Sequence, residues 1–174
     1  MKILSLKINN HKKAFELRTY KGSYEYPYAM LDAQPTERDK IASACIDPEL
    51  GNEAFTYELE SGVEDSIHID RVLEYNRDPA YMRDLLLYKL TLETKKLFES
   101  SPLGIREVSR RLDTSPTQIY RILDEENYRK SIDRVFELLT VLQCRIDIRS
   151  LSAEDDQVGA ANPDQPVLQF VIHA

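Results

Sequence analysis

The side chains with the clearest chemical use lie between residues 116 and 124. The apolar residues of this segment fall on one face of a helical wheel, and Thr117, Gln118 and Arg121 fall on or beside the opposite face. An arginine bonds guanine O6 and N7, a glutamine bonds adenine N6 and N7, and a threonine bonds a base edge or packs against a thymine methyl group. A polar helix face is often only solvated, but these side chains have the groups that contact base edges in the major groove of duplex DNA.

A second set of side chains has the chemistry of phosphate contacts. Cationic groups neutralise the backbone, and polar side chains and the N-terminus of a helix donate hydrogen bonds to phosphate oxygens. The predicted backbone contacts are Arg106, Arg110, Arg111, Ser115, Tyr120, Arg129 and Lys130. The three carboxylates of residues 124–126 follow the helix, where its dipole also disfavours anions, so we expect this end to point away from phosphates.

The elements that must position these residues form a helix-turn-helix. Ile105, Val108 and Leu112 recur at i, i+3 and i+7, which predicts a first short helix. Residues 113–115 form a three-residue turn, and Pro116 opens the second helix, where its missing amide donor is not needed. This arrangement places the second helix in the major groove.

The segment from Leu103 to Asp124 resembles the helix-turn-helix of the phage-repressor and Cro-like (Xre) superfamily, and the resemblance extends over residues 81–149. The positions that match the superfamily core are Val108, Leu112, Ile119 and Ile122. Ser115 matches the residue that caps the recognition helix, and Arg121 matches a position from which members of the superfamily reach DNA. The whole architecture is similar to antitoxin-like bacterial regulators that join a small β domain to such a module.

Three positions depart from the superfamily pattern. Ser109 replaces the usual alanine, a small residue that still permits close helix crossing. Asp113 replaces the usual turn glycine, which is tolerable because Asp visits the left-handed region more readily than most residues. Ile105 stands where many repressors have a phosphate-contacting glutamine, and Arg106 is the neighbour best able to replace that contact.

The first 75 residues show a different periodicity. Apolar and polar residues alternate with a period of two, which is typical of half-buried strands. The alternating runs include residues 4–8, 15–18, 24–28 and 55–60, and further strands are expected near 41–46 and 67–69. We expect an antiparallel β meander of five or six strands, with no internal repeat evident.

The periodicity becomes helical after Asp78-Pro79, which is typical of a helix start. Helices are predicted over about residues 80–99 and after Ser131, with a short strand around residues 146–148. The chain is therefore expected to be an α+β protein with an antiparallel β domain (1–77), a helical domain containing the helix-turn-helix (78–150) and an acidic flexible tail (151–174). The apolar end of this tail, residues 167–172, is β-prone and suited to a sheet edge.

Charge is distributed unevenly along the chain. The net charge of −7 divides into −5 for residues 1–80, +2 for residues 81–150 and −4 for residues 151–174. The only net basic segment is therefore the one that contains the helix-turn-helix, and binding to a polyanion depends on such a local concentration of positive charge.

Several classes of protein are disfavoured. No apolar run approaches the ~20 residues of a membrane helix, and charge interrupts the N-terminus before a signal-peptide core forms, so we expect a cytoplasmic protein without a membrane association. His11, His68 and His173 have no neighbouring ligands at metal-like spacing, and no Gly-rich phosphate loop or nucleophile motif is present. We expect neither an enzyme nor a metal or cofactor.

The main hypothesis is a transcriptional regulator, an antitoxin-like repressor that binds duplex DNA as a homodimer on paired half-sites. One alternative is a protein-interaction module, in which the acidic β domain binds a toxin or other protein and the helical part is a scaffold. Another is a single-strand or RNA binder that stacks bases on Tyr24, Tyr26 and Tyr28, although alternating tyrosines more often form the packed face of a sheet.

Overall fold

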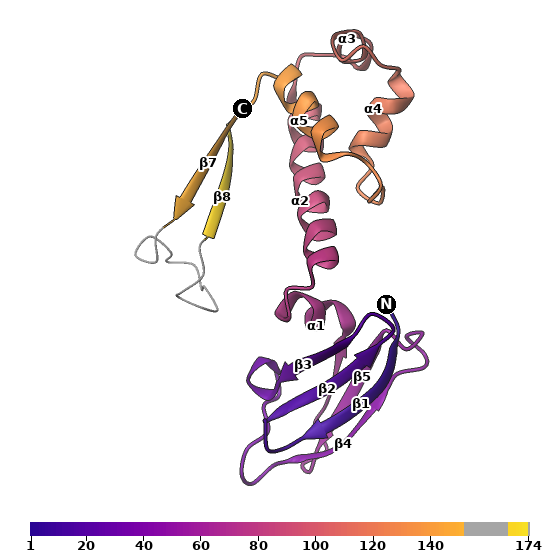
Figure 1. Cartoon of the computed structure of the whole chain (residues 1–174), viewed down its shortest axis with the longest axis vertical. Helices are drawn as coiled ribbons and strands as arrows, with labels where there is room; N and C mark the ends of the chain where they lie inside the picture. The colour runs from indigo at the N-terminus through magenta and orange to yellow at the C-terminus, as the bar shows by residue number, and fades with distance from the viewer. Residues whose placement is uncertain (152–166, 174) are drawn as a thin grey trace. The chain divides into compact units, whose positions relative to one another are not determined.

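The computed structural model describes residues 1–151 and 167–173, and the chain divides into two compact units, Met1–Asp84 and Leu85–Ala174. The first contains two antiparallel three-stranded sheets, and the second contains helices and a two-stranded sheet (Figure 1). The predicted α+β class is confirmed. The expected domain boundary lies at the start of helix α2 (Pro79–Ser100), whereas the units divide within this helix. Tyr81, in the first turns of α2, packs against the core of the first unit.

The first unit repeats one arrangement twice. Strands β1 (Ile3–Asn9), β2 (Ala14–Thr19) and β3 (Ser23–Pro27) form one meander, which a 3-10 helix, η1 (Tyr28–Met30), follows. Strands β4 (Ile41–Ile46), β5 (Ala54–Leu59) and β6 (Glu64–His68) form the other, which helix α1 (Ile69–Tyr75) follows. The sequence pattern predicted the strands but missed α1, whose first residue continues the alternation of β6.

The similarity of the two halves extends to details. The first strand of each half has a register irregularity near its start, and β2 and β5 share the same order of buried and exposed residues. Phe15 and Phe55, the second residues of β2 and β5, meet with ring centroids 4.9 Å apart. Contact between equivalent residues is typical of two copies related by an approximate two-fold axis. The expectation of no internal repeat was therefore wrong at the level of structure, because the two halves share a burial pattern but few identical residues, among them Phe15 and Phe55.

The tyrosines of β3 and η1 belong to the core of this unit. Tyr26 and Tyr28 are 1% and 7% exposed, and burial raises the pKa of both phenols. Tyr24 is half-buried and donates a hydrogen bond to Asp78 at 2.9 Å. The stacking alternative required these rings to form an accessible face, so the structure favours the packed-sheet interpretation.

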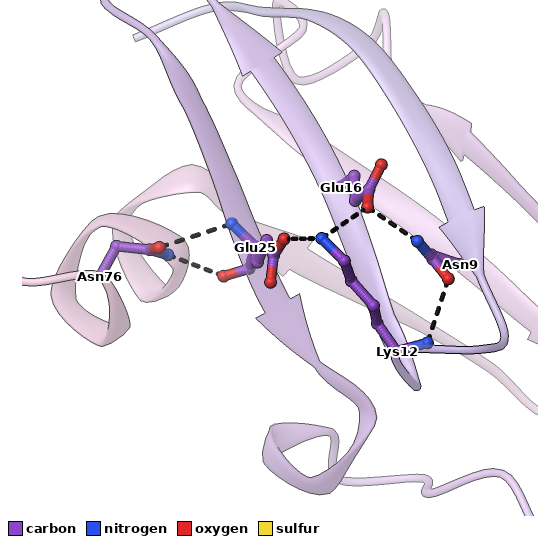
Figure 2. A network of polar contacts seen from close by, with 5 residues as sticks. All are labelled: Asn9, Lys12, Glu16, Glu25 and Asn76. Carbon is purple, nitrogen blue, oxygen red and sulfur yellow. Dashed lines mark hydrogen bonds and ion pairs between the residues drawn. The ribbon is translucent and has the colours of Figure 1, made fainter.

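The outward face of the first sheet is a polar network (Figure 2). Glu16 and Glu25 lie opposite one another on β2 and β3, and Lys12 bridges the two carboxylates. Asn9 donates to Glu16 at 2.8 Å, and Asn76, which caps the end of α1, bonds the backbone of Glu25. The lysine offsets the repulsion that two like charges in a cross-strand pair produce.

The second unit has an aliphatic core. Helices α3 (Ile105–Arg111), α4 (Pro116–Leu123) and α5 (Ile132–Val141) pack with the C-terminal part of α2. The fully or almost fully buried members of this core are Leu87, Val108, Ile119, Ile122, Leu123, Val135, Leu138 and Leu139. The predicted core positions of the helix-turn-helix are among them, except Leu112, which is partly buried.

The last elements form a hairpin-like sheet. Strand β7 (Arg145–Leu151) pairs antiparallel with β8 (Val167–His173), so the predicted strand near residue 146 and the expected role of the apolar C-terminal segment at a sheet edge are confirmed. The predicted flexibility of the tail concerns residues 152–166, which lie outside the described residues. Within the described residues, no helix is both long and apolar enough to cross a membrane.

Candidate nucleic-acid interface

The α3–α4 turn has the geometry that the sequence predicts. Asp113 adopts a positive φ of 46°, as expected of a residue in place of a turn glycine. The amide of Thr114 donates to the carbonyl of Ser109 at 3.0 Å and closes the end of α3. Ser115 is the N-cap of α4 and accepts from the amide of Gln118 at 3.3 Å, while Pro116 occupies the first turn. These interactions set where each helix ends and begins, and α3 and α4 pack against one another.

The small side chain of Ser109 allows α3 to pack closely in this core. Ser109 is 4% exposed, and its hydroxyl donates to the carbonyl of Ile105 at 2.7 Å, so the buried polar group is satisfied within its own helix. Val108 is fully buried beside it. A serine can therefore replace the alanine that the resemblance predicts here.

The predicted base-contacting residues lie together on the exposed face of α4. Thr117, Gln118 and Arg121 are exposed, as is Tyr120 at 61%, whereas Ile119, Ile122 and Leu123 are buried. Arg121 forms no ion pair with any residue that the structure describes. Its guanidinium is therefore available to a ligand.

Two of the cations of α3, unlike Arg121 of α4, are ion-paired with a carboxylate. Glu107 accepts two hydrogen bonds from Arg110, at 2.7 and 3.0 Å, and one from Arg111 at 2.7 Å. These bonds, with the two positive charges, lower the pKa of Glu107 to about 2. Arg110 and Arg111 remain on the exposed surface, but one carboxylate neutralises part of their charge. Arg106, on the same helix, is exposed and has no ion-pair partner among the described residues.

Two side-chain hydrogen bonds tie the loop after α4 to backbone carbonyls at the end of this helix. The Asn127 side chain donates to the carbonyl of Arg121 at 3.0 Å, and the Lys130 ammonium donates to the carbonyl of Asp124. Burial lowers the pKa of Lys130, although nearby Asp124 and Glu125 oppose the shift. Lys130 therefore supports the end of α4 as well as contributing charge, while Arg129 is exposed.

The acidic end of α4 is partly neutralised. Glu125 forms an ion pair with Lys95 of α2 at 3.2 Å, and its own backbone hydrogen bond and this lysine lower its pKa. Asp124 and Glu126 stay exposed. We still expect this end to face away from a polyanion.

A depression of about 440 Å³ lies between α4 and the start of α5. Its lining contains four cationic side chains and no carboxylate. The lining residues are Leu112, Thr114, Gln118, Arg121, Ile122, Asn127, Arg129, Lys130, Ser131 and Arg134. The structure thus brings together four of the predicted site residues, from α4 and from the loop after it, around one depression lined by cations. Thr117, Tyr120, Arg106, Arg110, Arg111 and Ser115 are not part of its lining.

Three residues of this region were missed by the sequence interpretation. Arg134 lines the depression from α5 and pairs with Glu137 at 2.7 Å, Asn127 fixes the loop, and Glu107 restrains two of the predicted phosphate contacts. The i, i+3 and i, i+4 spacings of Glu107 to the two arginines were a readable signal. The position of Arg134 depends on how α5 packs and had no local signal.

The surroundings show no competing metal site, since no group of three or more potential ligand side chains converges among the described residues. Comparisons with known proteins add no constraint. No protein-family model matches the chain, and neither a curated protein nor a solved structure matches it.

Proposed function

We propose that the chain is a sequence-specific duplex DNA-binding transcriptional regulator, an antitoxin-like repressor that reads the major groove with α4. The observation that carries this proposal is the exposed face of α4, where Gln118 and Arg121 border a depression lined by cations and free of carboxylates. Both side chains have the donor and acceptor groups that distinguish base pairs in the major groove.

Electrostatics support a polyanionic ligand at this surface. Arg121, Arg129, Lys130 and Arg134 line a single surface although the whole chain carries a net charge of −7. A local cationic surface binds phosphates through counterion release, and this contribution does not depend on the sign of the total charge. We propose that the protein acts in the cytoplasm, without a metal or cofactor, as a dimer that places two copies of α4 on half-sites of one duplex.

The test is selection of a binding site from a pool of random duplexes by the full chain. We expect enrichment of a sequence with two related half-sites, and gel-shift titrations in which this duplex outcompetes a scrambled duplex. A matched titration with the single strands of the same sequence tests the alternative ligand. No enrichment, or equal affinity for the selected and scrambled duplexes, would overturn the proposal.

A second candidate function is protein binding by the β unit, and one observation favours it. From the start of β1 to the end of η1 there are five basic and two acidic side chains, whereas from the start of β4 to the end of α1 there are one basic and nine acidic. The second sheet also places Glu58 opposite Glu64 with no cation paired to either among the described residues. This half suits a cationic partner, such as a basic toxin, and not DNA.

The two functions are separable by experiment. A Glu58→Gln, Glu64→Gln double variant should keep duplex binding and lose capture of a cationic partner protein. Arg121→Ala should have the opposite pattern. If both variants lose the same activity, the assignment of the two functions to separate units is wrong.

A further inference from the structure

Helix α2 has two apolar faces, and the core of the second unit explains only one of them. Leu87, Thr91 and Thr94 are buried, and Leu90, Leu97 and Phe98 pack beside them. Leu85, Tyr88 and Leu92 form a second stripe at spacings of three and four residues. At about 100° per residue, this stripe is centred about 140° around the helix from the buried face. Its three residues are partly exposed and belong to neither hydrophobic cluster.

We propose that this stripe is a dimer interface, in which Leu85, Tyr88 and Leu92 of α2 pack against the same residues of a second copy of the chain with the two helices parallel. The spacing places Leu85 and Leu92 at heptad position a and Tyr88 at position d. The pattern ends after Leu92, because the next positions are Lys95 and Glu99. The contact is therefore about two helical turns long.

The charges beside the stripe determine the helix polarity. Asp84 lies at position g on one flank and Lys89 at position e on the other. In a parallel pair, a residue at g meets the residue five positions later at e of the partner, so each Asp84 faces Lys89 of the second copy, twice per dimer. Asp84 contacts Arg83 of its own helix through Oδ1, and Lys89 forms no ion pair among the described residues. An antiparallel pair would not bring these two charges together.

Parallel packing also agrees with the proposed DNA interface, and this step alone rests on the proposed function. The helix-turn-helix follows the C-terminal end of α2 in each copy, so parallel helices place both recognition helices at the same end of the dimer. This arrangement is compatible with two half-sites on one duplex. Three partly exposed side chains per copy bury much less than the ~1,200 Å² of a standard interface, so the dimer should dissociate on dilution and persist on the duplex.

Disulfide trapping tests the interface and its polarity in the full chain with Cys45 and Cys144 replaced by alanine. Leu92→Cys and Tyr88→Cys, tested separately, should each form a self-disulfide, because equivalent a or d positions of parallel helices approach within disulfide reach. Leu86→Cys is the matched control, because Leu86 is 58% exposed and lies outside the stripe. Equal cross-linking of all three variants, or cross-linking of none, would overturn the proposal.

Charge reversal provides the second readout, by sedimentation equilibrium without DNA. Asp84→Lys should raise the dimer dissociation constant about fivefold or more, and adding Lys89→Asp should restore it, since the pair is re-formed with its charges exchanged. Failure of the second reversal to restore association contradicts parallel pairing. These measurements use no nucleic acid, so they distinguish failure of this interface from failure of the proposed DNA-binding function.

Discussion

Helices α3 and α4 are two short neighbouring helices with similar burial patterns and different electrostatics. Each buries one face in the same core and presents arginine to solvent. On α3, Glu107 binds both Arg110 and Arg111, whereas Arg121 of α4 has no ion-pair partner among the described residues. The number of basic residues in a segment therefore does not give the charge that it can offer to a ligand, because neighbouring carboxylates on the same helix neutralise part of it.

The same contrast exists at the helix N-termini. Ser115 caps α4 through its side chain, whereas the N-cap of α3 is Gly104, which provides no side-chain hydrogen bond. The helix proposed to read DNA is thus the one with the better-defined start and the less neutralised cation. This combination is expected of a rigid element that presents polar groups to a ligand.

The largest expected effect comes from removing the core contact of α4. Ile119→Ala should lower the free energy of unfolding of the helical unit by about 2–5 kcal/mol, because Ile119 is fully buried and its truncation leaves a cavity. Ile105→Ala on α3 is the matched control, since Ile105 is only partly buried. Guanidinium titration followed by far-UV circular dichroism measures both. A larger loss of unfolding free energy in Ile105→Ala than in Ile119→Ala would contradict this prediction.

The second prediction concerns binding at the two arginine positions. Arg121→Ala should cost about 1–3 kcal/mol at the selected duplex and reduce discrimination against scrambled DNA, if its guanidinium contacts a base. Arg110→Ala should weaken all duplexes evenly and by less, because Glu107 already offsets part of its charge. Gel-shift titrations at two salt concentrations separate the two effects, with circular dichroism as the folding control. Unchanged affinity and discrimination in folded Arg121→Ala would remove α4 as the reading helix.

Substitutions at the two N-caps should change the stability of the helical unit in opposite directions. Ser115→Ala removes the acceptor for the amide of Gln118 and should destabilise the helical unit by ~1 kcal/mol. Gly104→Ser supplies a cap to α3 at a position with φ −75° and open space around the added carbon, so it should stabilise by a few tenths of a kcal/mol. Thermal unfolding measures both. Melting temperatures that shift in the same direction and by the same amount in the two variants would contradict the assigned caps.

Glu107→Gln should make α3 electrostatically more like α4. Loss of the carboxylate frees Arg110 and Arg111, so affinity for any duplex should rise about threefold or more at low salt, and the slope of log K against log salt should steepen by up to ~1. Glu93→Gln on α2 is the matched control, because Glu93 also pairs with a cation at i+3. An equal gain in both variants would show a general charge effect and not release of these arginines.

The smallest expected effect is a pH dependence of α3. The pKa of Glu107 is about 2 in the folded chain, below its ordinary value of 4.5. A lowered pKa means that the ion-pair cluster stabilises the fold fully above pH 4.5 and loses this contribution as the pH falls through 2. A carboxyl NMR titration should show the low midpoint, and Arg110→Ala with Arg111→Ala should move it toward the ordinary value. A midpoint unaffected by these substitutions would rule out the cluster.

Much of the secondary structure follows from local pattern. Period-two alternation predicted the strands of both sheets, and Asp78, Ser115 and Ser131 mark helix starts that the structure confirms, each side chain accepting from an amide in the first turn. The helix α1 was missed because it is short and its first residue, Ile69, continues the apolar alternation of β6. The exposed residues of α4 were also predictable, since a helical wheel depends only on spacing.

The sequence by itself determined most of the strands and helices, though not α1, as well as where the helix-turn-helix lies and which α4 residues are exposed, because periodicity, caps and turn residues act over a few positions. Only the tertiary structure decided that the six N-terminal strands divide into two similar sheets that meet at Phe15 and Phe55. It also decided that Arg134 of α5 joins Arg121, Arg129 and Lys130 around one depression. Contacts between residues distant along the chain depend on how whole elements pack, and packing selects among many arrangements that are compatible with the same local pattern.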